Sequence, residues 1–349
     1  MPDRLVFSRR GALAAVASAA SALALGGCSA QDLVDAASGR AEAKPASGST
    51  FAFDTYCTFS VYGDDGALAK LSKACARYDA LFDLYDSKSD IARINAAAGA
   101  AVAVDADTLD VIARAVEFAR KTDGLFDITI GAVSTLWDFD KDVRPSDDQI
   151  AAALPHVGWK NVVLDRHAGT VALADPAAKL DLGGIAKGFV ADRLCDLLGK
   201  QTHATAAVIS LGGNIAYFGQ KPDGAPWDTG IRDPNDPGGS KTVGTAHVKG
   251  GSLVTSGLYE RTFTQGGVTY WHILDPKTGM PVKTDVVSDT IYCPSSTEAD
   301  ALSTALFVAG SERGAKVVDD FDDTAAYFIR DDGSRTESSR WQELTAFEA

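Results

Sequence analysis

The chain has 349 residues, a formal net charge of −14 at pH 7 and only five histidines. Such an acidic protein repels the phosphate backbones of nucleic acids, so we expect no nucleic-acid partner. The scarcity of histidine argues against a histidine-rich transition-metal site, whereas oxygen ligands suited to Mg²⁺ are abundant. The apolar fraction of 46% is sufficient to fill a large core.

The amino terminus has the order of an export signal. A positive segment (residues 4–10) precedes an apolar, alanine-rich run (residues 11–24) that is too short to span a membrane. Small residues then lead to Cys28, an ending typical of lipoprotein signals, so we predict that residues 1–27 are a signal peptide and that Cys28 is lipidated. The alternative is an ordinary signal with a chance cysteine. Paired arginines in the positive segment also suggest twin-arginine export, and the choice between the Sec and Tat routes stays open.

The segment after the signal differs in composition from the rest of the chain. Residues 28–50 are rich in Ala, Ser and Gly with scattered charge, which predicts a flexible tether. Residues 51–349 then form the predicted domain, and about 300 residues are enough for one large domain. We therefore expect an exported protein, anchored by lipid to the extracytoplasmic face of the cell membrane.

Four cysteines follow the predicted anchor: Cys57, Cys75, Cys195 and Cys293. Their separations match no zinc-binding pattern. Cys75 and Cys195 lie among apolar residues at helical spacing, so we predict inert, structural thiols. An exported location permits disulfides, but spacing reveals no pairing.

Apolar periodicity predicts helices and strands along the domain, without internal repeats. The predicted helices cover residues 67–85, 108–121, a segment that starts after Gly188, 298–309 and 312–319. The predicted strands cover residues 162–165, 170–174, several segments between 206 and 273 with a hairpin turn at Gly266-Gly267, and 325–329. Adjacent hairpins are too many for a purely parallel, doubly wound sheet. We predict an α+β fold in which mixed and antiparallel sheets pack with helices.

The first stretch that could bind a ligand or take part in catalysis is rich in glycine. The common nucleotide-binding glycine motifs, the metalloprotease motif and the nucleophile elbow are all missing from the sequence. Instead, Asp181–Gly188 joins a strand-like run (residues 178–182) to a predicted helix. Glycines let the main chain approach a ligand, amides at a helix start favour anions, and Lys187 adds a cation. The alternative is a tight turn with no ligand.

A second stretch (Glu298–Phe307) places Asp300 and Thr304 four residues apart, and therefore on one helix face. A carboxylate and a hydroxyl at this spacing can fill two positions of an octahedral Mg²⁺ shell. The alternative is an aspartate that stabilises the helix dipole, with a threonine on the neighbouring turn.

Two loops complete the set of candidate segments. His272–Gly279 combines a strand end with an Asp-Pro turn. His272 could act as a general base because its unperturbed pKa lies near neutrality, or it could be a hydrogen-bonded strand residue beside an Asx turn. Asp123–Thr129, followed by aromatic residues within 136–139, could receive an isoalloxazine or adenine ring, unless these aromatic residues belong to the core.

These stretches occur in the order found in one family. From about Phe53 to Gly314 the chain resembles the FAD:protein FMN transferases, the ApbE family. The matching stretches are Ser89–Asn95, Asp123–Asp127, Asp181–Gly188, Leu211–Asn214, Ile231–Pro234, Thr255–Gly257 with Tyr259–Arg261, His272–Gly279 and Ala299–Thr304. The resemblance implies a single large ApbE-like, T-fold-like domain.

The resemblance also implies roles for particular residues. The implied Mg²⁺ site comprises Asp300, Thr304, Ser303 and the carbonyl of Gly184, with His272 and Lys187 as catalytic residues. The implied FAD contacts are Tyr56, Asn95, Leu125, Phe126, Asp127, Asp181, Lys187 and Leu274. Tyr56 stands where the family usually has methionine, and it could replace that side chain as a stacking surface.

The activity that the resemblance implies is Mg²⁺-dependent transfer of FMN from FAD to a threonine or serine hydroxyl of an acceptor flavoprotein, with release of AMP. The acceptor should be another exported or membrane-bound protein. Two alternatives stay open: an FAD pyrophosphatase that gives free FMN and AMP, and a non-catalytic FAD-binding lipoprotein. The joint presence of Asp300, Thr304 and His272 argues against flavin storage alone, because binding a flavin needs none of them.

Overall fold

The computed structural model describes residues 44–236 and 240–349. The predicted signal peptide, Cys28 and the first part of the predicted tether lie outside these residues. The folded unit begins at Pro45, and β1 (Ala46–Ala52) pairs along its whole length with β2 (Thr55–Tyr62). The tether predicted to reach residue 50 is therefore wrong at its end. Composition misses β1 because main-chain pairing, not side-chain type, makes this segment a strand.

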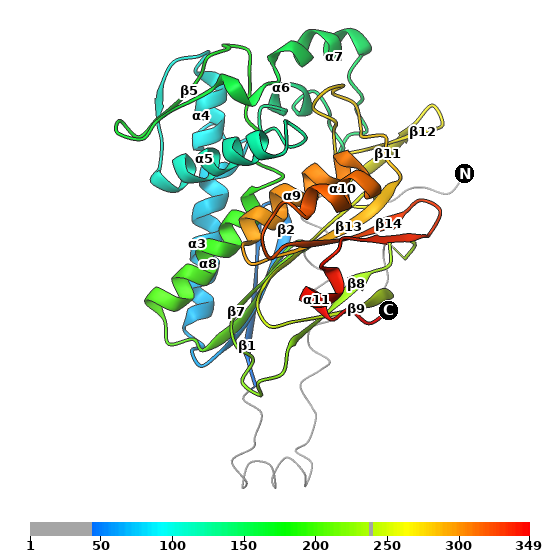
Figure 1. Cartoon of the computed structure of the whole chain (residues 1–349). Helices are drawn as coiled ribbons and strands as arrows, with labels where there is room; N and C mark the ends of the chain where they lie inside the picture. Colours follow the sequence, from blue (N-terminus) through cyan, green and yellow to red (C-terminus); the bar gives the residue numbers. More distant parts are fainter. Residues whose placement is uncertain (1–43, 237–239) are drawn as a thin grey trace, which may run out of the picture. The chain divides into compact units, whose positions relative to one another are not determined.

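A large antiparallel sheet organises the domain (Figure 1). Its strands follow the order β1-β2-β6-β7-β10-β13-β14-β15. The remaining members are β6 (Ala206–Leu211), β7 (Asn214–Gly219), β10 (Gly251–Gly257), β13 (Val286–Cys293), β14 (Ala325–Arg330) and β15 (Arg335–Glu337). Every pairing in it is antiparallel, which confirms the predicted fold class.

Three smaller antiparallel sheets accompany it. They comprise β3 (Val102–Ala103), β4 (Val162–Asp165) and β5 (Thr170–Leu173) in one sheet, β8 (Trp227–Arg232) with β9 (Thr242–Val248), and β11 (Thr262–Gln265) with β12 (Val268–Trp271). The turn between β11 and β12 contains Gly266 and Gly267, both with positive φ, as the hairpin prediction requires.

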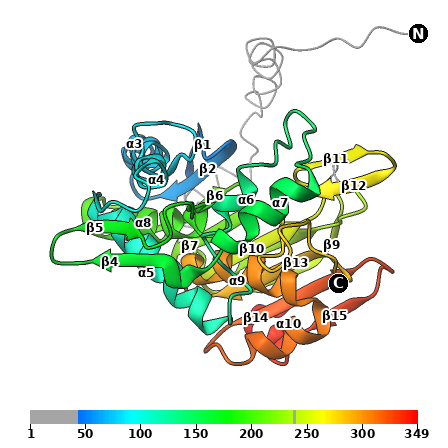
Figure 2. The ribbon, with the colours of Figure 1, turned by 90° about the horizontal axis from the view of Figure 1, so that it is seen from above.

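The helices fall into long ones that pack on the sheet and short ones in its connections. They are α3 (Ala67–Phe82), α4 (Asp90–Ala96), α5 (Ala106–Lys121), α6 (Gly131–Ser134), α7 (Asp147–Ala153), α8 (Ala186–Gln201), α9 (Ser296–Ala309), α10 (Ser311–Val318) and α11 (Trp341–Thr345), with short 3₁₀ turns η1 (Leu154–His156) and η2 (Trp159–Asn161). Figures 1 and 2 show α8 and α9 crossing one face of the large sheet.

Two cores lie on opposite faces of the sheet, because successive side chains of a strand point in opposite directions. In β14, Ala326 and Phe328 join the core under α3, α8 and α9, whereas Tyr327 and Ile329 join the core under α11 and the β8–β9 hairpin. A third apolar cluster includes Trp137, whose ring stacks on Phe139 at 5.8 Å between centroids. The aromatic residues of segment 136–139 therefore belong largely to a core and do not form an open ring-binding surface.

Several predicted element boundaries differ from the observed ones by one to three residues, and two of them affect the site. The helix predicted over 67–85 ends at Phe82, because Asp83 has extended backbone angles, and Tyr85 beyond it is 78% exposed. The helix predicted to start after Gly188 begins at Ala186. Amphipathic spacing continued past the true end of α3 because Tyr85 fell on the apolar stripe by chance.

The strand-like run predicted over 178–182 is also wrong. It forms no strand, and only Lys179 bridges to Ile130. Its apolar side chains are buried as part of an irregular segment, since Leu180 and Leu182 are almost completely inaccessible. A short apolar run does not distinguish a strand from a buried loop.

The thiols and the helices add two findings. Cys57, Cys75, Cys195 and Cys293 are all free, and three of them are buried, which agrees with a structural role. Within residues 44–236 and 240–349, no helix combines the length and apolar character needed to cross a membrane.

Candidate active site

The predicted glycine-rich stretch forms a loop that enters α8. The Asp181 main-chain amide donates to the Ile128 carbonyl at 2.8 Å, which ties this loop to the stretch that begins at Asp123. The Asp181 carboxylate accepts hydrogen bonds from the Ser134 hydroxyl at 2.6 Å and from the Gly183 amide at 2.8 Å. These bonds hold a carboxylate in a fixed position just before the helix.

The start of α8 presses directly against α9. The Gly188 amide donates to Asp300 Oδ2 at 2.9 Å. A Cβ atom at position 188 would lie 2.1 Å from the Ser296 carbonyl oxygen and 2.7 Å from Asp300 Cβ. Only glycine allows this approach, so the close contact of the two helices positions the Asp300 carboxylate.

A second contact fastens the amino terminus of α9. The Asp192 carboxylate on α8 accepts from the amides of Ser296 and Thr297 at 2.8 and 3.0 Å, and from the Thr297 hydroxyl at 2.6 Å. Main-chain amides at a helix start need acceptors, and a carboxylate also suits the helix dipole. Sequence reasoning missed this role, because a helical aspartate has no local signal for a partner more than 100 residues away.

Oxygen donors from two elements meet beside this contact. Asp300 is 4% exposed, and its Oδ1 lies 3.9 Å from the Lys187 ammonium, which also donates to the Gly183 carbonyl at 3.1 Å. A Cβ atom on Gly184 would lie 2.8 Å from Thr304 Oγ1, so the Gly184 main chain is next to that hydroxyl. The Asp300 carboxylate and the Thr304 hydroxyl lie on one face of α9, and the Gly184 main chain lies beside that hydroxyl. These are oxygen donors of the kind that Mg²⁺ prefers.

Ser303 has a different environment from Asp300 and Thr304. Its hydroxyl donates to the Asp300 carbonyl at 2.8 Å and accepts from the Ser256 hydroxyl at 3.0 Å. The side chain is fully buried and links α9 to β10. These bonds give Ser303 a packing role. In the described part of the chain, no group of three His, Cys, Asp or Glu residues could hold a metal ion, so a site here depends on the mixed donors.

His272 follows β12, and its main-chain amide donates to the Arg261 carbonyl at 3.2 Å. Its side chain is exposed to solvent, yet its pKa is lowered to about 4. The main cause is the protein around the imidazole, which removes part of its hydration although the residue stays exposed, and the positive charges of Arg261 and Lys187 add to the effect. The imidazole is therefore neutral at neutral pH and able to accept a proton.

Two tyrosines present open ring faces. Tyr56 is 61% exposed and meets Phe51 edge-on, with ring centroids 5.5 Å apart. The pKa of Tyr85 is raised, first by desolvation and then by the Asp181 carboxylate, which places Tyr85 within electrostatic reach of the predicted FAD contact Asp181. Sequence reasoning missed Tyr85 because it was assigned to the apolar face of a helix.

Several other predicted FAD contacts have side chains that serve the fold. The Asn95 amide donates to the Leu180 carbonyl at 2.9 Å and accepts from the Leu180 amide at 2.7 Å. Leu125, Phe126 and Leu274 are buried in apolar clusters. These residues shape the loop around Asp181, and the three apolar ones can meet a ligand mainly through their main chain.

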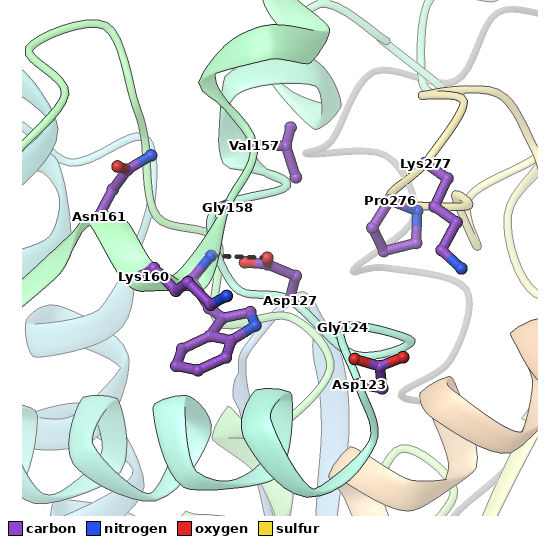
Figure 3. A pocket seen from close by; sticks show the side chains of 10 residues that line it. Asp123, Gly124, Asp127, Val157, Gly158, Lys160, Asn161, Pro276 and Lys277 are labelled. Atoms are coloured by element: carbon purple, nitrogen blue, oxygen red, sulfur yellow. Dashed lines mark hydrogen bonds between the residues drawn. The ribbon is translucent and has the colours of Figure 1, made fainter.

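Asp127 borders a cavity of about 330 Å³ that Figure 3 shows from close by. Its carboxylate accepts from the Thr129 amide and from the Trp159 amide, both at 2.8 Å, and burial raises its pKa. The residues that line the cavity are Asp123, Gly124, Asp127, Val157, Gly158, Trp159, Lys160, Asn161, Pro276 and Lys277. The structure thus brings together the stretch at 123–129 and the turn after His272. In that turn the Asp275 carboxylate accepts from the Lys277 amide at 2.8 Å, as an Asx turn requires.

Solved structures with this fold define the class. The ApbE protein of Thermotoga maritima superposes with a TM-score of 0.79 and 33% identity, and the match covers 86% of this chain and 98% of that one. The flavin transferase ApbE of Vibrio cholerae superposes with a TM-score of 0.75 and 27% identity, covering 85% and 98% of the two chains. The fold is that of the flavin transferases.

Sequence relatives agree with the structural match. A FAD:protein FMN transferase of Treponema pallidum is 37% identical over 319 residues, which cover 85% of this chain and 87% of the relative. A FAD:protein FMN transferase of Haemophilus influenzae is 30% identical, with 80% and 85% covered. Residues 53–328 match the model of the ApbE family, and the chain belongs to that family.

Proposed function

We propose that this chain transfers FMN from FAD to a threonine or serine hydroxyl of an acceptor flavoprotein and releases AMP, in a Mg²⁺-dependent reaction. The observation that carries the proposal is the meeting of Asp300, Thr304 and the Gly184 main chain beside Lys187. The relatives named FAD:protein FMN transferases support the same activity.

The reaction follows from the chemistry of phosphoryl transfer. Asp300, Thr304 and the Gly184 main chain would hold Mg²⁺, which supplies neutralising charge for the pyrophosphate of FAD. The acceptor hydroxyl oxygen bonds to the FMN phosphorus while the bond from that phosphorus to the bridging pyrophosphate oxygen breaks, and AMP leaves. The Lys187 ammonium, which lies 3.9 Å from Asp300 Oδ1, would stabilise the anionic phosphates.

His272 completes the proposal as general base. The acceptor hydroxyl must lose its proton during attack, and a neutral imidazole can take it. The low pKa of His272 keeps the ring unprotonated at neutral pH. Tyr56 and Tyr85 offer open ring faces on which a flavin or adenine ring could stack.

The cellular setting is part of the proposal. Lipidation at Cys28 would anchor the chain at the extracytoplasmic face of the membrane after export, and the acceptor would be an exported or membrane-bound flavoprotein. The segment that carries this argument is the signal-like sequence of residues 1–27.

The test follows AMP release and peptide mass in one reaction. Full-length protein in detergent is incubated with FAD, Mg²⁺ and a threonine-containing peptide, and mass spectrometry detects a peptide that has gained FMN less water. AMP with free FMN alone would favour the pyrophosphatase, and bound, intact FAD would favour the storage protein.

A pair of variants tests the metal site. Asp300→Ala should lower the rate of AMP release by about 100-fold or more, since the carboxylate that holds the charge-stabilising ion is lost. Asp196→Ala is the matched control, because this carboxylate lies on α8 and pairs with Lys200 at 2.9 Å on the surface. An unchanged rate in Asp300→Ala would remove the basis of the proposed metal site.

A further inference from the structure

Two of the family-like stretches supply no metal ligand and no catalytic side chain to the proposed chemistry: Ile231–Pro234 and Tyr259–Arg261. The structure brings them together. The Arg232 guanidinium lies 5.8 Å from the centroid of the Tyr259 ring, and it pairs with Glu260 at 3.3 Å. Pro234 and Tyr259 then line the same cavity, of about 510 Å³. This volume lies within the roughly 300–1,000 Å³ of typical ligand pockets.

The cavity lies between two hairpins. The β11–β12 hairpin contributes Thr262, Thr269 and Trp271, and the turn between β14 and β15 contributes residues 330–333. Leu258 and Tyr259, in the segment after β10, form part of the wall between them. Figures 1 and 2 show the β11–β12 hairpin projecting away from the large sheet.

The wall of this cavity is continuous with the strand end that carries His272. Trp271 directly precedes His272, and Thr262 directly follows Arg261, whose carbonyl accepts the His272 amide at 3.2 Å. An extended chain advances about 3.3 Å per residue. A peptide seated in the cavity therefore needs only a few more residues to reach the proposed general base.

None of the residues predicted to bind FAD or Mg²⁺ lines this cavity, so FAD and a second ligand could be bound at the same time. Its wall combines the apolar and aromatic side chains of Leu258, Tyr259 and Trp271. The exposed Asp331 and Asp332 also line it, and the neighbouring Arg330 pairs with Asp285 at 3.1 Å, so these two carboxylates form its acidic rim. This chemistry suits an apolar or aromatic anchor side chain with a basic neighbour.

We propose that the cavity between the β11–β12 hairpin and the β14–β15 turn is the docking site of the acceptor, which binds as an extended segment with its threonine or serine close to His272. The inference rests on the proposed function and adds to it the surface that selects the acceptor. The segment places an aromatic or aliphatic side chain in the cavity and a basic residue at the acidic rim.

The experiment separates docking from chemistry. The probe is a set of synthetic 15-residue peptides with one threonine flanked by an aromatic residue and a lysine, from which the best substrate of the wild-type chain is chosen. Thr269→Trp fills the cavity from the exposed hairpin. Val268→Trp is the matched control, because Val268 is the adjacent strand residue, is 52% exposed and does not line the cavity.

We expect Thr269→Trp to raise the KM for the peptide at least tenfold, while AMP release from FAD without peptide stays within twofold of wild type. Val268→Trp should change neither quantity. An unchanged KM in Thr269→Trp, or an equal rise in both variants, would overturn the docking site. A change in oligomeric state with no change in KM would identify the cavity as a contact between copies and also overturn it. If the wild-type chain releases AMP but modifies no peptide, this result contradicts the proposed transferase function and therefore also the docking site, whereas a normal wild-type reaction with an unchanged KM in Thr269→Trp contradicts the docking site alone.

Discussion

Gly188 is the position where a single methyl group should have the largest consequence for the site. In Gly188→Ala the added Cβ would lie 2.1 Å from the Ser296 carbonyl oxygen, about 1.4 Å short of the roughly 3.5 Å optimum for non-bonded atoms. The obstructing atoms belong to the main chain of α9 and to Asp300 Cβ, which cannot rotate away as a flexible side chain could. The two helices must therefore separate.

The free energy of unfolding should fall for two reasons. Overpacking of a close helix contact costs about 1–3 kcal/mol. Loss of the hydrogen bond from the Gly188 amide to the Asp300 carboxylate adds about 1.5–3 kcal/mol. A total of about 2.5–6 kcal/mol corresponds to a fall in Tm of about 4–9 °C for a domain of about 300 residues. The displaced Asp300 should also raise the Mg²⁺ concentration needed for half-maximal AMP release.

Gly199→Ala is the matched control on the same helix. A Cβ there meets only the edge of the Phe218 ring, at 3.3 and 3.7 Å, and alanine favours a helix over glycine by up to about 1 kcal/mol. Circular dichroism during heating gives Tm, and AMP release across a Mg²⁺ series gives the metal requirement. If Gly188→Ala unfolds at the wild-type temperature, or if Gly199→Ala loses as much stability, the argument for a close α8–α9 contact fails.

Two further predictions concern groups with shifted pKa values. The acid limb of the pH profile of kcat/KM for the acceptor should have its midpoint near the His272 pKa of about 4 and not near 6.5, because desolvation, and then the charges of Arg261 and Lys187, disfavour the imidazolium. A midpoint between 6 and 7 would contradict this. Asp289 is 1% exposed, and burial raises the pKa of its carboxyl group well above 3.8. The stability that the protonated carboxyl allows is therefore lost as pH rises above the unfolded value near 3.8. Asp289→Val should raise the free energy of unfolding by about 1–3 kcal/mol, and by more at pH 8 than at pH 4. Urea unfolding of both proteins at the two pH values measures this difference, and an unchanged free energy of unfolding in the variant would refute the prediction.

The local spacing of residues was sufficient to predict several features of the site without any tertiary contact. The helical repeat placed Asp300 and Thr304 on one face of α9, and the structure brings the Gly184 main chain to that face. The Asp-Pro turn at Asp275 was predicted from its own residues, since an Asx turn needs only a side chain and the amide two residues on. The family resemblance likewise depended on short stretches whose order is a property of the chain alone.

Long-range partners were decided only by the tertiary structure. The two ends of the Asn95 amide bind the main chain of Leu180, 85 positions away, and Asp192 on α8 caps α9 more than 100 positions away. Tyr85 is open to solvent because α3 ends at Phe82. A polar side chain can form hydrogen bonds with several kinds of partner, and the local sequence does not determine which partner lies next to it in the folded protein. These roles therefore depend on how the helices pack on the sheet.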